Sequence, residues 1–81
     1  MIEPGIYRHF KGQFYAVDNV AKHSESDELY VVYRALYGER GLWVRPLEMF
    51  DETIEREGVR MKRFAPASTE EIALLKSQQV D

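Results

Sequence analysis

Short runs of apolar residues, several of them alternating with polar ones, follow one another along most of the chain, and this pattern predicts β-strands separated by glycine turns. The expected strands are residues 5–10, 13–21, 29–36, 42–45 and 59–64. By the period of two, Tyr15, Val17 and Asn19 should share one face of the second strand. The run 29–36 is apolar on both faces, which predicts the central strand of the sheet.

Two segments have helical rather than alternating patterns. Within residues 47–57, the spacing of Met49 and Phe50 predicts a short helical turn whose two side chains cover an open end of the sheet. Ser68 and Glu71 have the spacing of a capping box, in which each side chain accepts a hydrogen bond from the other residue's backbone amide. The terminal helix predicted there reaches about residue 79. Its apolar stripe should dock on the strands, and the stripe consists of Ile72, Leu74 and Leu75.

Five short strands without crossover helices predict a mainly β protein built on a small SH3-like antiparallel barrel with a short C-terminal helix. The barrel domain is expected at residues 1–66 and the helix or tail at residues 67–81. An OB-type barrel is the alternative, although it usually has a longer helix between its third and fourth strands.

Composition narrows the classes of function. The 81 residues contain 11 Lys and Arg against 14 Asp and Glu, and the net charge of -3 argues against a general binder of duplex nucleic acid, which normally has a basic face. There is no cysteine, so disulfides and thiolate metal sites are excluded. The start of the chain lacks the pattern of a secretion signal and no apolar run is long enough for a membrane span, so we expect a cytoplasmic protein without a membrane partner.

Four segments together resemble one known family. They are YRHFKG at 7–12, AKHSE at 21–25, VVYRALYG at 31–38 and WVRPLEMF at 43–50. In this order the chain is similar, over residues 5–64, to a bacterial family of small domains, the domain of unknown function 1653. The resemblance implies an SH3-like barrel. It implies no activity, so no residue takes a catalytic or binding role from it.

The polar loop at His23, Ser24 and Glu25 contains the residue types of a nucleophilic site. Neighbouring residues on an extended loop point in different directions, however, so adjacency in sequence does not predict catalysis. We favour a loop ordered by side-chain bonds to backbone amides, with ligand contact as the second interpretation. The histidines, His9 and His23, have no zinc-type spacing, and we expect neither a metal site nor a cofactor.

Trp43 and Arg45 share one face of their strand. In one interpretation Leu42 and Val44 face the core, and Trp43 then lies exposed beside the Arg45 cation as a platform for an anionic ligand. In the other, Trp43 covers a second small core and Arg45 pairs with an acidic residue such as Glu48. The sequence leaves both open.

Other residues could extend or compete with such a platform. Tyr33, Tyr37 and Arg8 would extend it if the strands pair as hairpins, although a tyrosine in a central strand is more often part of the barrel wall. The local cationic cluster of Arg60, Lys62 and Arg63 could contact phosphates, but nearby Glu55 and Glu57 favour a solvated strand face.

From the sequence we expect an uncharacterised small domain that acts as a non-catalytic recognition module for a small anionic ligand, a peptide or a partner protein. The candidate ligand-binding residues are Arg8, His23, Ser24, Glu25, Tyr33, Tyr37, Trp43 and Arg45. One alternative is an RNA- or other nucleic-acid-associated barrel, whose main support is analogy of fold. The other is a small hydrolase that uses His23 and Glu25.

Overall fold

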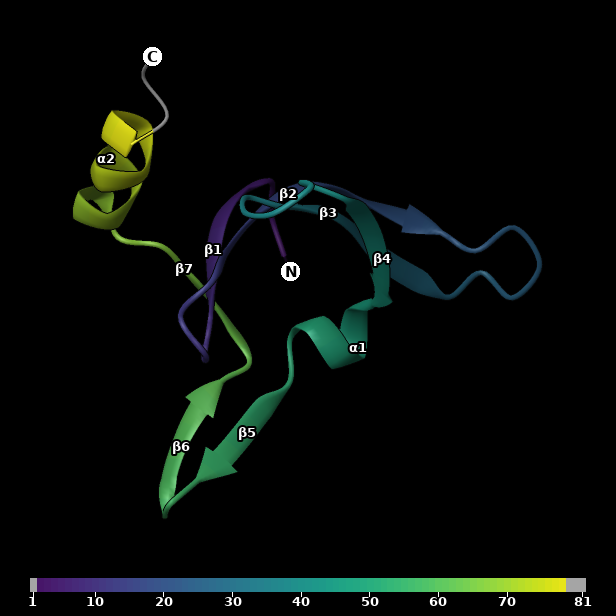
Figure 1. Cartoon of the computed structure of the whole chain (residues 1–81). Helices are drawn as coiled ribbons and strands as arrows, with labels where there is room; N and C mark the ends of the chain where they lie inside the picture. The colour runs from purple at the N-terminus through teal and green to yellow at the C-terminus, as the bar shows by residue number, and fades with distance from the viewer. Residues whose placement is uncertain (1, 79–81) are drawn as a thin grey trace.

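The computed structural model describes residues 2–78, and in them a strongly curved antiparallel sheet arches over a short helix (Figure 1). The elements are β1 (Gly5–His9), β2 (Phe14–Lys22), β3 (Leu29–Ala35), β4 (Leu42–Pro46), α1 (Leu47–Phe50), β5 (Thr53–Arg56), β6 (Val59–Lys62), β7 (Phe64–Pro66) and α2 (Thr69–Gln78). Five strands form the main sheet in the order β4-β3-β2-β1-β7, and β5 pairs with β6 in a separate hairpin. The expected mainly β, antiparallel class with a short C-terminal helix is therefore confirmed.

The sheet does not close into a barrel. Strands β4 and β7 are its two edges, and no hydrogen-bonded ladder joins them in the part of the chain that the structure describes. The expected SH3-like barrel is thus an open, bent sheet. The expectation that residues 29–36 form the central strand was also wrong, because β2 lies at the centre and β3 lies next to the β4 edge.

Two strands more than expected arise from the region after α1. Glu57 and Gly58 both have positive φ, 53° and 79°, which suits the tight turn of a two-residue hairpin and separates β5 from β6. The run 59–64 is not one strand either. It breaks at Arg63, after which β7 pairs with β1 and leaves the β5–β6 hairpin projecting from the body (Figure 1).

A bulge in β2 corrects the predicted alternation. The pairing of β2 with β3 shifts between Val17 and Asn19, so one extra residue turns the following side chains to the opposite face. Asn19 is therefore exposed, and Val20 instead packs beside Val17 against the core. A strict period of two would have placed a polar residue in the core at this point.

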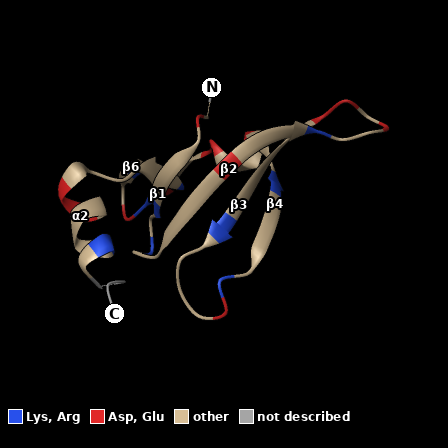
Figure 2. Ribbon diagram, turned by 90° about the horizontal axis from the view of Figure 1, so that it is seen from above, with Lys and Arg blue, Asp and Glu red and all other residues tan. Residues whose placement is uncertain are grey.

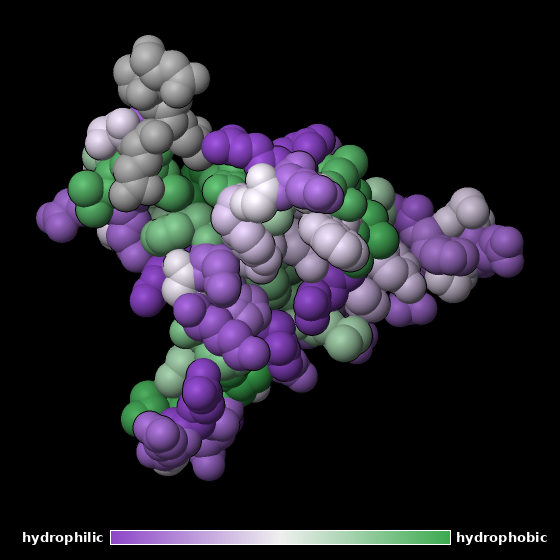
Figure 3. All heavy atoms as spheres, in the orientation of Figure 1, coloured by the Kyte–Doolittle hydropathy of each residue, from purple (hydrophilic) through white to green (hydrophobic). Residues whose placement is uncertain are grey.

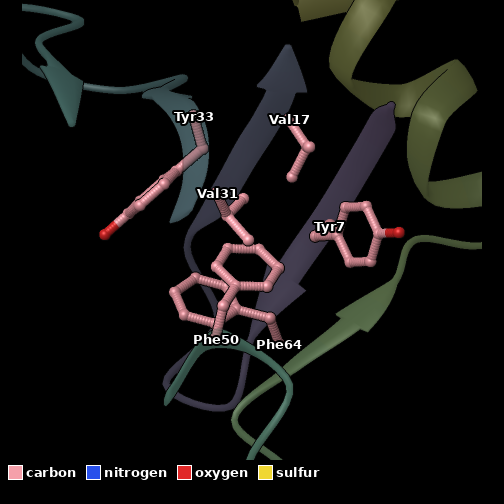
Figure 4. Packing of buried hydrophobic residues seen from close by; sticks show 6 residues of the cluster. All are labelled: Tyr7, Val17, Val31, Tyr33, Phe50 and Phe64. Carbon is pink, nitrogen blue, oxygen red and sulfur yellow. The ribbon is translucent and has the colours of Figure 1, made fainter. Parts of the chain in front are cut away.

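The core lies on the concave face and is largely aromatic (Figure 4). Phe50 is completely buried, and its ring stacks on that of Phe64 with 4.1 Å between centroids and 4° between planes. Tyr7 and Tyr33 pack edge-on against Phe50 at 5.6 and 5.4 Å. The predicted turn at residues 47–50 is thus confirmed for Phe50, whereas Met49 is exposed.

The predicted capping box begins α2. The Glu71 amide donates to Ser68 Oγ at 3.1 Å, and the Ser68 amide donates to Glu71 Oε1 at 2.9 Å. Of the apolar stripe, Ile72 and Leu75 are partly buried and Leu74 is exposed, so the helix docks by only part of its stripe. The predicted end near residue 79 falls outside the described residues. Within residues 2–78, no helix has the length and apolar character that a membrane span requires.

Phe50→Ala should lower the free energy of unfolding by about 3–5 kcal/mol, because it removes a fully buried ring and leaves a cavity. The neighbouring exposed Met49→Ala is the matched control and should change it by about 0.5 kcal/mol or less. Urea unfolding followed by circular dichroism measures both. Equal effects of the two substitutions would contradict this description of the core.

Candidate functional site

A pocket of about 230 Å³ opens on the concave face at the β3–β4 end of the sheet. Five side chains line it, three phenols, one indole and one guanidinium, from Tyr15, Tyr33, Tyr37, Trp43 and Arg45. The strand register explains why they meet. Trp43 is directly opposite Tyr33 in the β3–β4 pair, and Arg45 is opposite the buried Val31, so both β4 side chains lie on the same face as the core.

Neither interpretation of Trp43 from the sequence was complete. Trp43 and Arg45 lie on the concave face and Leu42 and Val44 on the convex one, yet the Trp43 side chain extends beyond the packed core and stays 59% exposed. A Cβ at Gly41 would lie 3.3 Å from Trp43 Nε1, so the indole rests closely over this glycine. The ring therefore forms an open wall of the pocket.

Arg45 carries the charge of the pocket. Its Nε donates a hydrogen bond to Tyr33 Oη at 3.3 Å, and its Cζ lies 5.8 Å from the centroid of the Phe64 ring. The side chain is half-buried. Within residues 2–78 it has no carboxylate partner, and the pairing with Glu48 considered above does not form.

Tyr15 and Tyr37 complete the pocket with a hydroxyl pair. Their oxygens are 2.6 Å apart, and their rings pack edge-on at 5.5 Å. The pKa of Tyr15 is raised well above its ordinary value of 10, mainly by burial and to a smaller extent by the hydrogen bond with Tyr37. The Tyr15 hydroxyl is therefore neutral near pH 7 and can serve a ligand as a hydrogen-bond donor or acceptor.

Tyr15 was missing from the candidates based on sequence. Its alternation with Val17 did place the two residues on the same face of the strand, and in the structure Tyr15 lies opposite Ala35 at the end of β3. What the sequence lacked was the register between β2 and β3, which brings Tyr15 within 5.5 Å of the Tyr33 ring.

Phe64 and His9 pack against the aromatic rings that line the pocket. Phe64 packs edge-on against Tyr15, Tyr33 and His9, with ring centroids 5.4, 5.8 and 4.9 Å away. Burial lowers the pKa of His9, and the positive charges of Arg63, Arg45 and Lys11 lower it further. The imidazole is therefore neutral near pH 7, and its Nδ1 accepts a hydrogen bond from the Lys11 amide at 3.2 Å.

Residues 23–25 lie at the end of the β2–β3 hairpin, which projects from the body of the sheet (Figure 1), and none of them lines the pocket. His23 Nδ1 accepts hydrogen bonds from the Glu25 and Ser26 amides at 3.2 and 3.4 Å. These bonds order the loop, as the favoured interpretation of the sequence expected. The acceptor, however, is the His23 side chain and not Ser24 or Glu25. His23, Ser24 and Glu25 do not join the pocket.

Arg8 also lies elsewhere. Its Nε is 3.5 Å from Glu71 Oε2 of α2, and both residues line a separate hollow of about 190 Å³. Of the predicted candidates, Tyr33, Tyr37, Trp43 and Arg45 are thus brought together, while Arg8 and the three loop residues are not.

The cationic cluster of Arg60, Lys62 and Arg63, on β6 and directly after it, is largely paired. Lys62 Nζ is 3.1 Å from Asp51 Oδ1, and Arg63 Nη2 is 2.7 Å from Glu52 Oε1. Arg60 lies opposite Glu55 in the β5–β6 register. Among the described residues, no three His, Asp or Glu side chains converge as a metal site would require.

The fold and pocket define a small open-sheet domain with an aromatic site on its concave face. The chain belongs to the family described as "Protein of unknown function (DUF1653)", which it matches over residues 5–66, so the expected membership is confirmed. A crystal structure of a DUF1653 protein from Bordetella bronchiseptica is similar, with 37% sequence identity and a TM-score of 0.75, over 82% of this chain and 87% of that one. No curated protein matches the chain.

Stability should fall as the pH is lowered through the ordinary histidine value of 6.5, because unfolded His9 takes up a proton more readily than folded His9. The contribution is fully present above pH 6.5 and is lost as pH falls towards the depressed pKa of the folded state. Urea unfolding of the wild type and His9→Gln between about pH 7.5 and 5.5 measures it. His23→Gln is the control for the removal of a histidine from the exposed loop, outside the core. Identical pH dependence in wild type and His9→Gln would contradict the account of His9.

Proposed function

We propose that this domain is a non-catalytic recognition module that binds an anionic group in the pocket formed by Tyr15, Tyr33, Tyr37, Trp43 and Arg45. The observation that carries the proposal is the half-buried Arg45 guanidinium, which faces a hollow and has no carboxylate partner within residues 2–78. A partly desolvated cation loses hydration that a counter-charge would replace. A carboxylate or phosphate of a ligand would supply that charge through a charge-assisted hydrogen bond.

The pocket walls favour binding over catalysis. At neutral pH their polar groups are phenol hydroxyls, an indole N–H and a guanidinium, and none of these is an effective general base. Rigid aromatic rings instead offer contact area at a small cost in conformational entropy. Trp43 supplies the most exposed of these surfaces, at the mouth of the pocket.

The two alternatives have less support. For nucleic-acid binding, two of the three cations on the β6 side are already paired with Asp51 and Glu52, which reduces the charge available to phosphates. For a hydrolase, His23 Nδ1 accepts backbone hydrogen bonds in an exposed loop, so the proposed base is occupied by its own loop.

Because Trp43 is the single tryptophan, its fluorescence reports directly on the pocket. Inorganic phosphate and N-acetyl-aspartate methylamide, titrated separately, distinguish a phosphate from a carboxylate ligand. We expect at least one of them to shift the Trp43 emission. Arg45→Ala should weaken that binding about ten-fold or more, since a hydrogen bond to a charged group contributes about 1.5–3 kcal/mol.

Arg60→Ala is the matched control, because Arg60 is an exposed arginine of the β5–β6 hairpin and does not line the pocket. It should leave the affinity within about two-fold of the wild type. An emission that responds to neither anion, or an equal affinity in Arg45→Ala and wild type, would contradict the proposed function. The urea midpoint of each variant verifies that it remains folded.

A further inference from the structure

Strand β4 ends the main sheet, and one side of its backbone has no partner strand among residues 2–78. The Ala35 amide donates to the Gly41 carbonyl at 3.1 Å, so Ala35 and Gly41 form a hydrogen-bonded pair at the end of the β3–β4 ladder. Hydrogen-bonded and non-hydrogen-bonded pairs alternate along an antiparallel ladder, so Trp43 and Arg45 direct their backbone groups towards β3. The N–H and C=O groups of Leu42 and Val44 therefore point away from the sheet, along its open edge.

This edge has little of the protection that exposed strands usually have. Leu42 and Val44 are 54% and 62% exposed on the convex face, and apolar residues lie along β4 in the space-filling view (Figure 3). Beside them, a hollow of about 260 Å³ is lined in part by Tyr30, Val32 and Val44. Edge strands are normally protected by charge or proline, and here Pro46 limits pairing only at the end of the strand.

Positive charge gathers at the same edge. Lys and Arg colouring marks both β3 and β4 in Figure 2. Arg34, Arg40 and Arg45, on these strands and the turn between them, make no ion pair with any described residue. A second copy of the chain pairing β4 to β4 would bring the unpaired positive charge of two such edges into one joined sheet, which like-charge repulsion disfavours. An acidic partner would instead neutralise this charge.

We propose that the β4 edge accepts an extended acidic peptide as an added antiparallel strand of the main sheet. This inference rests on the proposed function, since it identifies the anionic group as an acidic side chain of that peptide. Backbone bonds would come from Leu42 and Val44, and alternate side chains would face opposite sides of the sheet. Acidic residues would then lie on the concave face near Trp43 and Arg45, and apolar β-branched residues on the convex face against Leu42 and Val44.

The probe is a blocked peptide of about eight alternating valine and aspartate residues, long enough for one strand. On saturation with this peptide, the exchange of the Leu42 and Val44 amide hydrogens with solvent should slow by at least about ten-fold, as expected of newly hydrogen-bonded groups. A peptide N-methylated at every second residue, on the side that faces β4, should bind about ten-fold more weakly, because it lacks the donors that the edge requires. A lysine-for-aspartate peptide should not bind.

Val44→Pro removes an outward N–H and should weaken peptide binding about ten-fold or more, while Val44→Thr keeps that N–H and should change it about two-fold or less. Neither substitution alters the pocket side chains, so both variants should still bind the small anions. If Trp43 and Arg45 respond to the peptide while the Leu42 and Val44 amides exchange as before, the edge inference is wrong and the proposed function stands. Failure of the peptide to bind, binding of single-stranded RNA in its place, or protection of these amides by self-association would also overturn the inference.

Discussion

The stack of Phe50 on Phe64 is the contact on which the rest of the structure depends. Phe50 comes from the single turn that follows β4, and Phe64 begins β7, so the two rings join opposite edges of an open sheet. Because no ladder bonds join those edges within residues 2–78, side-chain packing on the concave face keeps the sheet bent. An 81-residue chain without cysteine has few other means of closing such a core.

The same contact positions the pocket. Phe64 is buried against Tyr15, Tyr33 and Arg45, so the ring that closes the core also supports three of the side chains that line the candidate site. Trp43, which rests over Gly41 at the rim, is the most exposed part of the site. The core therefore fixes where the cation lies, while the exposed indole is left free to meet a ligand.

Local signals predicted those features that depend on a few consecutive residues. The helical turn at Phe50 and the Ser68–Glu71 capping box both belong to this class. Pairing register and sheet closure were not predictable in this way, because a bulge of one residue after Val17 reverses which side chains face inward. For the same reason Tyr33, Tyr37, Trp43 and Arg45 could be proposed as a group, whereas Tyr15 could not be added to it and Arg8 could not be removed.

A double-mutant cycle on the stacked rings tests this account most directly. The free energy of unfolding is measured for the wild type, Phe50→Leu, Phe64→Leu and the double variant. If the stack closes the sheet, the effects of the two substitutions on the free energy of unfolding should be coupled by about 1 kcal/mol or more. The second substitution should then cost little stability, because the first has already removed the contact. Effects that add to within about 0.3 kcal/mol would show that each ring is held by its other neighbours, and would contradict the central role given to their contact.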